Sequence, residues 1–339
     1  MEKTRLSPVF AAERFVVERV RTHPRKQEAI TLVEPAILVK WIVERPPRLL
    51  TSTQTAHARL NAIAVTPDGE TIAVAPTKAP IEFRRWGDLS LQPDVINPIL
   101  EEATSLAFSP DGHWFALADR HEAIYLIDRN KGSLTAKIEG GEWTSPLLFD
   151  PTSNILASAC SFEGGGYIRI DRIDQKGQLY PIYELDRSNF STLPSVFVDS
   201  LIHLAFSPDG HWLALFESSA IYHNQRPSGW RGNIVLYCVE TGVLQWQTVI
   251  DAQVTGDRRS LEEVGSPMGF FTELLFVSKA EIACGASHGL ILLYDAATGR
   301  LIRHIDLHTN ASVRSLSLDK DNAMLWVVLS DGKLSLISL

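Results

Sequence analysis

Short apolar runs alternate with polar turns along almost the whole chain. In one stretch the run LAF (106–108) meets the turn Ser-Pro-Asp-Gly, and the runs WFALAD, AIYLID and LTAKIE follow after polar connections. Proline presets φ at the start of such a turn and glycine adopts a positive φ at little cost, so this is a strong turn signal. No stretch keeps a helical period. The pattern predicts units of four short β-strands separated by tight turns.

This unit is repeated along the chain. The string LAFSPDGHW occurs twice, at Leu106–Trp114 and Leu204–Trp212, and a looser copy, IAVTPDGET, spans Ile63–Thr71. Weaker copies lie at 20–30, 147–155, 274–282 and 316–324. Most neighbouring copies stand 41 to 43 residues apart at the turn residue, which is the period of a four-stranded propeller blade. Such a unit cannot bury both faces of its sheet alone, so neighbouring units must stack.

The sequence therefore predicts an all-β chain forming a single seven-bladed β-propeller of four-stranded antiparallel blades over residues 1–339. The last unit stops at its third strand, KLSLISL, so the segment 1–12 is expected to supply the outer strand, close the ring and cover an open edge. The expected blades span 14–50, 61–98, 104–140, 145–186, 202–250, 271–306 and 312–339.

Composition and charge are those of a folded acidic chain. Hydrophobic residues make up 45% and charged residues 21% of the 339 positions, and the formal net charge is −8. An acidic chain is a poor nucleic-acid binder, because phosphate contacts need a concentrated basic surface. Basic residues do gather in the first 50 positions, but glutamates are interspersed with them, and we interpret this segment as a solvated face. These basic residues are Lys3, Arg5, Arg14, Arg19, Arg21, Arg25 and Lys26.

Three cysteines, Cys160, Cys238 and Cys284, lie singly within apolar runs. Their odd number and wide spacing predict neither a disulfide framework nor a zinc site. The N-terminal residues lack the continuous apolar core of a signal peptide, and no apolar stretch has the length of a membrane span. We therefore expect a reducing, cytoplasmic setting, with no cofactor, no metal and no membrane span.

The segment LILLYDAATGRLIRHIDLHT, at Leu290–Thr309, resembles a WD repeat. Tyr294-Asp295 stands where the WD-repeat family has its Trp-Asp pair, and His308 stands where the family has Gly-His. Copies of the pattern cover nearly the whole chain. In other units the signature neighbourhoods are occupied by Ile127, Cys238 and Ile337.

The resemblance also implies a structural hydrogen-bond network. In the family, a turn aspartate and a loop histidine bond to each other beneath a serine and the tryptophan, which ties the blade together. Asp331 and His308 fall at these positions of one unit, so the resemblance implies that they share a buried hydrogen bond. Trp41 and His57 stand at comparable positions in their own units.

Two short motifs in the sixth unit could carry chemistry. The run Gly285–Gly289 matches the G-x-S-x-G nucleophile elbow, which requires a strand-to-helix turn. Apolar runs on both sides of Ser287 instead predict two strands. His304 and His308 are four residues apart, and we favour a structural role for His308 over metal ligation.

The run Phe83–Gly87 (FRRWG) resembles the phosphoinositide-binding Phe-Arg-Arg-Gly motif of some propellers, with a tryptophan inserted. It falls on the third predicted strand of its unit, so we give peripheral lipid binding low weight. The chain contains no Gly-rich phosphate loop of the Walker type and no paired carboxylates in a catalytic arrangement. We therefore expect no catalytic residues.

Two adjacent repeat intervals exceed a blade of about 42 residues, by roughly 15 and roughly 29 residues. The additional residues fall in four segments predicted to be loops. Segments 161–166 and 217–232 connect second to third strands, and segments 187–200 and 251–269 connect fourth strands to the next blade. In an up-and-down blade both connection types emerge on the same face, so the four loops are expected to converge there.

Those loops contain aromatic residues and arginines, the types enriched at interaction hot spots. We interpret them as a partner-binding surface, although long loops are also tolerated without function. The predicted function is a non-catalytic protein–protein interaction scaffold within a larger assembly. A ligand- or phosphoinositide-binding propeller and a propeller hydrolase remain as alternatives. The expected partner-binding residues are Phe162, Phe190, Phe197, Tyr222, Arg226, Trp230, Arg231, Arg258 and Arg259.

Overall fold

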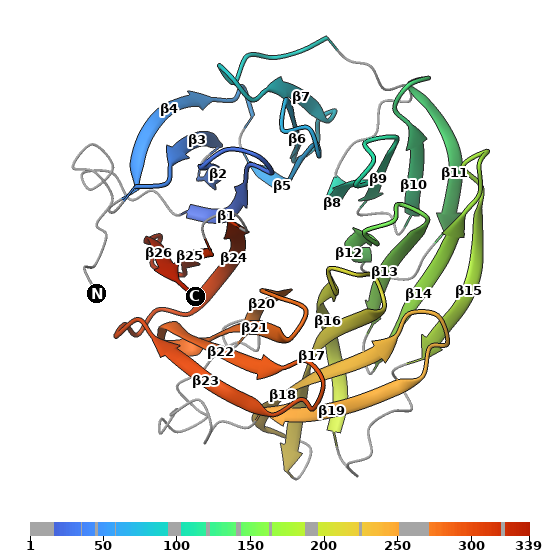
Figure 1. Cartoon of the computed structure of the whole chain (residues 1–339), viewed down its shortest axis with the longest axis vertical. Coiled ribbons are helices and arrows are strands. Elements are labelled where there is room, and N and C mark those ends of the chain that lie inside the picture. Colours follow the sequence, from blue (N-terminus) through green and yellow to red (C-terminus); the bar gives the residue numbers. More distant parts are fainter. Residues whose placement is uncertain are drawn as a thin grey trace. The chain divides into compact units, whose positions relative to one another are not determined.

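The computed structural model of the chain describes residues 17–34, 36–44, 47–57, 59–93, 103–119, 123–139, 144–162, 165–186, 196–223, 226–250, 271–319 and 323–339. The chain divides into two compact units, one comprising 1–138 and 314–339 and the other 139–313. Figure 1 shows the strands of both units, coloured along the chain. Each antiparallel sheet is called a blade below, and blades are numbered in chain order.

The first unit contains blades 1, 2, 3 and 7. Blade 1 consists of β1 (Val17–Thr22), β2 (Glu28–Val33), β3 (Ile37–Ile42) and β4 (Arg48–Gln54). Blade 2 consists of β5 (Leu60–Val65), β6 (Thr71–Pro76) and β7 (Glu82–Arg85). Blade 3 consists of β8 (Ala103–Phe108), β9 (Trp114–Asp119), β10 (Ala123–Asp128) and β11 (Ser133–Glu139). Blade 7 consists of β24 (Val313–Asp319), β25 (Met324–Leu329) and β26 (Leu334–Ser338).

The second unit contains blades 4, 5 and 6. Blade 4 consists of β12 (Thr144–Phe149), β13 (Ile155–Phe162), β14 (Gly165–Ile173) and β15 (Leu179–Asp186). Blade 5 consists of β16 (Val196–Phe206), β17 (Trp212–His223), β18 (Arg226–Cys238) and β19 (Leu244–Ile250). Blade 6 consists of β20 (Phe271–Phe276), β21 (Glu281–Ala286), β22 (Leu290–Asp295) and β23 (Leu301–Asp306), with the 3₁₀ turn η2 (Ser287–Gly289) between β21 and β22.

Seven sheets of three or four antiparallel strands make the chain an all-β, seven-bladed β-propeller. The fold class predicted from the repeats is thereby confirmed. Among the described residues blade 7 has three strands, and blade 2 has three strands plus an isolated bridge between Arg84 and Leu91. The segment 1–12, expected to supply the outer strand of blade 7, lies outside the described residues, so that clasp stays a prediction.

Side chains alternate between the two faces of each strand, and this alternation builds an apolar layer between neighbouring blades. In the first unit, for example, Phe83 of blade 2 and Phe115 of blade 3 meet edge to face, with ring centroids 5.7 Å apart. In the second unit Leu213 and Val235 of blade 5 share a buried cluster with Ile168 of blade 4. The core therefore lies between the sheets, as expected for blades that cannot bury both faces alone.

The first and last blades of the chain pack against each other within the first unit. Trp41 of β3 and Trp326 of β25 belong to one buried cluster. The backbone N–H of Val20 donates to Ser315 Oγ at 3.3 Å, and that of Thr22 donates to Ser317 Oγ at 3.1 Å. These bonds join β1 to β24, which run side by side in Figure 1. Hydroxyl groups thus satisfy backbone donors between blades that are far apart in sequence.

The repeated Ser-Pro-Asp-Gly string forms the same turn wherever it occurs. In blade 3, Ser109 Oγ donates to Asp111 Oδ1 at 2.5 Å and accepts the backbone N–H of Trp114 at 2.8 Å. In blade 5 the corresponding distances are 2.6 Å from Ser207 to Asp209 and 3.0 Å from Trp212 N to Ser207 Oγ. A side-chain hydroxyl therefore takes the place of a backbone acceptor at the start of the second strand.

The turn glycines also bring neighbouring blades close together. Gly112 and Gly210 both have φ of +75°, and a Cβ on either would lie 3.3 Å from a ring carbon of the proline at the matching turn of the preceding blade, Pro67 or Pro151. On Gly299, at φ +69°, a Cβ would lie 2.5 Å from the Trp246 ring. Glycine is required at these turns for its conformation and for lack of space.

Candidate functional site

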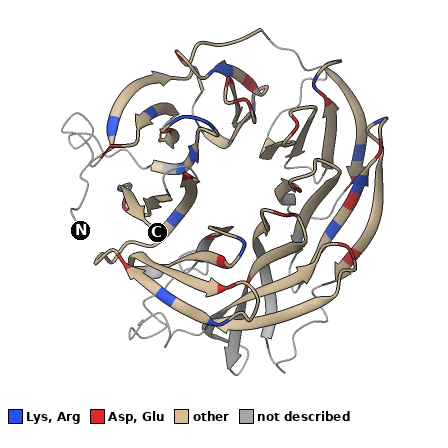
Figure 2. Cartoon of the chain, in the orientation of Figure 1, with Lys and Arg blue, Asp and Glu red and all other residues tan. Residues whose placement is uncertain are grey.

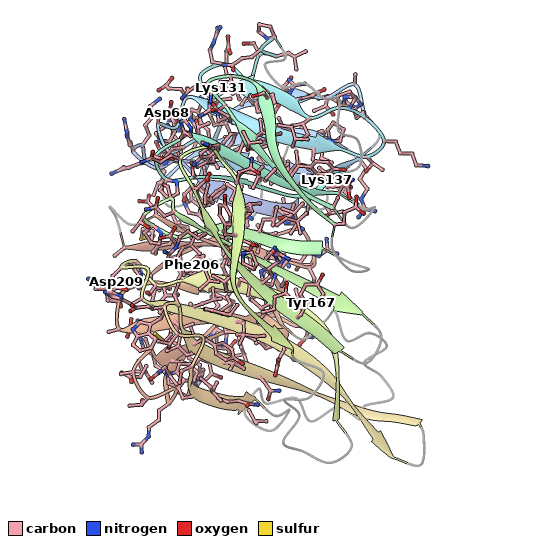
Figure 3. All side chains as sticks on the ribbon, turned by 90° about the vertical axis from the view of Figure 1, so that its right-hand side faces the viewer. Asp68, Lys131, Lys137, Tyr167, Phe206 and Asp209 are labelled. Carbon is pink, nitrogen blue, oxygen red and sulfur yellow. The ribbon has the colours of Figure 1, made fainter. Side chains whose placement is uncertain are left out.

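The three inner strands of blade 5 are longer than those of the blades without insertions. β16, β17 and β18 contain 11, 12 and 13 residues, whereas β8, β9 and β10 of blade 3 contain six each. The added length is formed by residues 196–200, 218–223 and 226–231, here called the blade 5 extension. At about 3.3 Å per residue, each of the two longer segments spans about 20 Å. In Figure 3 β17 and β18 continue towards the lower right, away from the turn that holds Asp209.

The loop predicted for 217–232 is wrong, because these residues form the ends of β17 and β18 except at 224–225, which lie outside the described residues. The pairing is continuous from Ser218↔Gly232 through Ser219↔Arg231 and Ala220↔Trp230 to Ile221↔Gly229, and it resumes after an irregularity at Tyr222↔Pro227 and His223↔Arg226. Ile, Tyr and Trp favour extended backbone. These strand ends carry no strict alternation of apolar and polar residues, and for that reason the sequence pattern predicted a loop there.

The other predicted loops are also partly strand. Residues 196–200 extend β16, and residues 161–162 and 165–166 end β13 and begin β14, where Phe162 pairs with Gly165. Phe190 and the pair Arg258 and Arg259 lie outside the described residues, as do 187–195 and 251–270. The prediction that these positions form a binding surface stays untested there.

The register brings three of the predicted partner-binding positions into two neighbouring rows of one sheet. Phe197 of β16 and Trp230 of β18 both pair with Ala220 of β17, so positions 197 and 230 flank one small residue in a single cross-strand row. Paired positions share a face of the sheet. Arg231 pairs with Ser219 in the next row, which belongs to the opposite face. The extension therefore offers different residue types on its two faces.

A buried polar pair marks the base of the extension. Glu217 and Asn233 face each other across β17 and β18, and Asn233 Nδ2 donates to Glu217 Oε1 at 3.1 Å. Glu217 is 1% exposed and Asn233 is 6% exposed. A one-residue slip of the hairpin would separate these two groups, so we interpret the pair as a device that specifies register.

Arg169 of the neighbouring blade 4 is paired with two carboxylates of its own blade. Arg169 Nε lies 2.8 Å from Asp171 Oδ2, and its Nη1 lies 3.0 Å from Glu184 Oε1. Hydrogen bonding to Asp171, the largest contribution, raises the pKa of the Arg169 guanidinium. Figure 2 shows basic and acidic residues mixed along β14 and β15, whereas β19 contains none.

The Phe83–Gly87 motif serves the packing of blades 1 and 2. Arg84 is 8% exposed, its Nε donates to Glu82 at 2.8 Å, and its Nη1 donates to the Leu89 carbonyl at 2.9 Å. Trp86 is fully buried and donates to Glu28 of β2 at 2.5 Å. With Arg84 buried and paired, Arg85 is the arginine of the motif that is exposed. The motif lies on the third strand of its blade, β7, as predicted.

The predicted buried bond between His308 and Asp331 is wrong. The His308 side chain is 75% exposed, its Nδ1 lies 3.2 Å from Asp306 Oδ2, and its backbone N–H donates to Asp306 Oδ1 at 2.6 Å. Asp331 is exposed and bonds to both the backbone and the side chain of Lys333. Each aspartate, Asp306 and Asp331, thus accepts the backbone N–H of the second residue after it. These local turns hold His308 and Asp331 apart from each other.

A histidine–acid bond of the implied kind occurs in blade 2 instead. His57 lies between β4 and β5, and its Nε2 is 2.7 Å from Glu82 Oε1, with both side chains largely buried. In blade 1, Trp41 Nε1 donates to Thr31 Oγ1 at 2.9 Å, which is the Trp–hydroxyl half of such a network. The sequence pattern pointed to His57 and Trp41, but Thr31 and Glu82 were missed because neither stands at a position that the motif specifies.

The G-x-S-x-G match lies on a turn between two strands, as predicted. Ser287–Gly289 forms η2 between β21 and β22, so the helix that a nucleophile elbow needs is replaced by a strand. In the part of the chain that the structure describes, no group of three or more His, Cys, Asp or Glu side chains is placed to hold a metal ion. Within the same residues, no helix has the length and apolarity of a membrane span.

Comparison with models of known protein families and with curated protein sequences found no match. The fold and the geometry of the blade 5 extension are therefore the observations on which an interpretation of function rests.

Proposed function

We propose that the chain is a non-catalytic protein–protein interaction scaffold that binds its partner through the blade 5 extension. The observation that carries this proposal is the three-stranded extension itself, which lengthens one blade by about 20 Å. It holds Phe197, Tyr222, Arg226, Trp230 and Arg231, of the residue types that dominate interaction hot spots. Propellers use loops and edges around a rigid body in this way.

We further propose that the chain is a divergent WD-repeat protein in a reducing, cytoplasmic setting. The Trp41–Thr31 bond in blade 1 and the His57–Glu82 bond in blade 2 support the first point, because they are similar to the tryptophan–hydroxyl and histidine–acid bonds of the network that the WD-repeat resemblance implies. Cys238 and Cys284, both free thiols, support the second. Burial raises the pKa of the Cys284 thiol, which keeps it protonated and unreactive.

The two alternatives receive less support. A phosphoinositide site would need the arginines of the Phe83–Gly87 motif, but the Arg84 guanidinium donates hydrogen bonds to Glu82 and to the Leu89 carbonyl. A hydrolase would need an exposed nucleophile beside a base, and Ser287 lies on a strand-to-strand turn.

The test is a variant in which the hairpin of the extension is removed at a position where β17 and β18 are paired. Ser218 and Gly232 are paired, so replacing 219–231 by Asn-Gly closes the hairpin with a two-residue turn and leaves the blade body intact. Proteins captured by the tagged chain from extracts of its source cells are identified by mass spectrometry and compared with those captured by the trimmed variant. Tyr180→Ala, at a 53% exposed position of β15, is the matched control.

We expect the trimmed variant to lose the captured proteins while its Tm stays within a few degrees of the intact chain, and Tyr180→Ala to retain them. In a purified complex, Trp230→Ala with Arg231→Ala should weaken binding by about 2 kcal/mol or more, roughly 30-fold in Kd. Recovery of the same proteins by the trimmed variant would refute the proposal.

A further inference from the structure

The blade 5 extension differs in charge from the rest of the chain. Residues 218–231 contain Arg226, Arg231 and His223 and no aspartate or glutamate, in a chain of formal net charge −8. The one carboxylate of the three extended segments is Asp199 on β16, on the far side of β17 from β18. Within the extension β18 is therefore a cationic strand, and it is the strand farthest from that carboxylate.

Among the residues that the structure describes, β18 is also the outer strand of the extension. β19 pairs with β18 from Tyr237↔Leu244 as far as Gly232↔Ile250, where β19 ends. From Arg226 to Arg231 the described residues pair with β18 on the β17 side alone. An edge strand of this kind presents backbone N–H and C=O groups that an extended peptide can pair with.

The two arginines stand at the two ends of this edge. Arg226 pairs with His223 at the tip, and Arg231 pairs with Ser219 two rows above the Glu217–Asn233 pair at the base. Four residues of strand lie between the two arginines, which are about 17 Å apart along the strand. Arginine recognises carboxylates with two parallel hydrogen bonds, which gives such an edge a preference for acidic side chains spaced along an extended chain.

We propose that the partner docks an acidic, extended segment along the outer edge of β18 between Arg226 and Arg231. This inference rests on the proposed interaction function and names the chemistry of the partner. A protein segment is favoured over a nucleic acid or a membrane surface, because those polyanions reward a broad concentration of basic residues, and an acidic chain repels them at long range. A short segment with a few carboxylates needs only the local cationic edge.

Selection of peptides on the full-length chain tests the proposal without knowledge of the natural partner. Random 12-residue peptides displayed on phage are selected on the intact chain, after depletion on the trimmed variant that lacks 219–231. We expect the enriched peptides to contain an excess of Asp and Glu. Arg226→Glu with Arg231→Glu should weaken them at least 10-fold, whereas Arg300→Glu with Arg303→Glu, at exposed positions just before and within β23, should not.

Proline scanning of an enriched peptide tests the edge pairing separately. Proline lacks the N–H needed by a ladder bond, so substitutions should abolish binding at every second position. Loss at all positions or at none overturns edge addition.

Several other outcomes would overturn the inference. Enriched peptides that require the extension but show no acidic excess would refute it and leave the proposed interaction function standing. Selection that yields no extension-dependent peptide would also refute it. Tighter binding of a 20-nucleotide single-stranded DNA, or of vesicles containing phosphatidylserine, that disappears in the double arginine variant would assign the edge to a different polyanion. The proposed function itself fails only if trimming leaves the natural partners bound.

Discussion

Blades 3 and 5 carry the same nine residues, LAFSPDGHW, and nevertheless end at different lengths. In both, the serine hydroxyl bonds to the aspartate and accepts the N–H of the tryptophan, and in both the glycine lies against the proline of the preceding blade. At the other end β9 stops at Asp119, whereas β17 continues to His223. The motif fixes one end of a blade and leaves the opposite end free to vary.

The difference has a packing cause. At the turn that follows the first strand, neighbouring blades approach so closely that a Cβ on Gly112 or Gly210 would reach the adjacent proline, so the turn tolerates little change. At the opposite end, β17 and β18 continue beyond the buried pair Glu217 and Asn233 to His223 and from Arg226, so the length of the strands varies there. Blade 5 therefore carries an extension at the end opposite the constrained turn.

The largest expected effect is in the shared body of the two blades. Phe115 of blade 3 and Leu213 of blade 5 are fully buried at the same position after the motif tryptophan. We expect Phe115→Ala to cost about 3–5 kcal/mol and Leu213→Ala about 2–5 kcal/mol of unfolding free energy, since each leaves a cavity. Urea unfolding measures both. A cost below about 1 kcal/mol at either site would show that its blade is not held by the core described here.

The motif serines should give the next largest effect. Ser109→Ala and Ser207→Ala remove the acceptors of the backbone N–H groups of Trp114, which is buried, and Trp212, which is partly buried, at an expected cost of about 1–3 kcal/mol each. Ser133→Ala, at an exposed position of β11, is the control and should change stability by less than about 0.5 kcal/mol. If the losses of unfolding free energy in Ser109→Ala and Ser207→Ala differ by more than the experimental error, the two turns are not energetically equivalent.

The blade 5 turn differs from the blade 3 turn in one partner of its aspartate. Asp209 Oδ2 lies 3.4 Å from Nζ of Lys279 in blade 6. The hydrogen bond from Ser207, aided by Lys279, lowers the pKa of the Asp209 carboxyl to about 2. Its stabilisation is therefore fully present above the unfolded pKa, near 4, and is lost as the pH falls towards 2. We expect Asp209→Asn to cost about 1–2 kcal/mol at pH 7 and almost nothing at pH 2. Unfolding curves at both pH values test this, and an unchanged gap at pH 2 would contradict it.

The smallest effect is expected at the turn of blade 2. There the ring that lies against the turn glycine, Gly69, belongs to His23 and not to a proline. A Cβ on Gly69 would collide with the ring of His23, which is 5% exposed. Burial, aided by Lys26 and opposed by Glu28 and Glu70, lowers the pKa of His23. Since the unfolded chain protonates first, stability should decline as the pH falls below about 6.5.

Two histidine variants isolate this pH effect. His23→Asn keeps an acceptor for the Arg25 N–H, which His23 Nδ1 accepts at 2.9 Å, but does not titrate. It should remove part of the slope of unfolding free energy between pH 7 and pH 5. His304→Asn, at an exposed position, should leave the slope unchanged. Identical slopes in wild type and His23→Asn would show that His23 is not the titrating group.

Much of the architecture could be predicted from the sequence, because propeller blades are made by local turns and short-range pairing. Ser109, Gly112 and their counterparts in blade 5 act within a few residues of themselves, so their pattern is visible in the string. The segment 217–232 was predicted as a loop, because its polar residues and glycines do not alternate with apolar ones. Pairing of Ser218 with Gly232 onwards depends on a strand continuing beyond the core, which no local pattern records.

The sequence by itself determined the all-β class, the seven blades and the turns that begin their second strands, since each depends on φ preferences and hydroxyl acceptors close in the chain. Only the tertiary structure decided which polar side chains meet. His308 pairs with Asp306, two residues away, whereas His57 pairs with Glu82 of blade 2. The tertiary structure also placed Phe197 and Trp230 on either side of Ala220. Partners separated by many residues are chosen by strand register and blade packing, and these arise only when the whole sheet has formed.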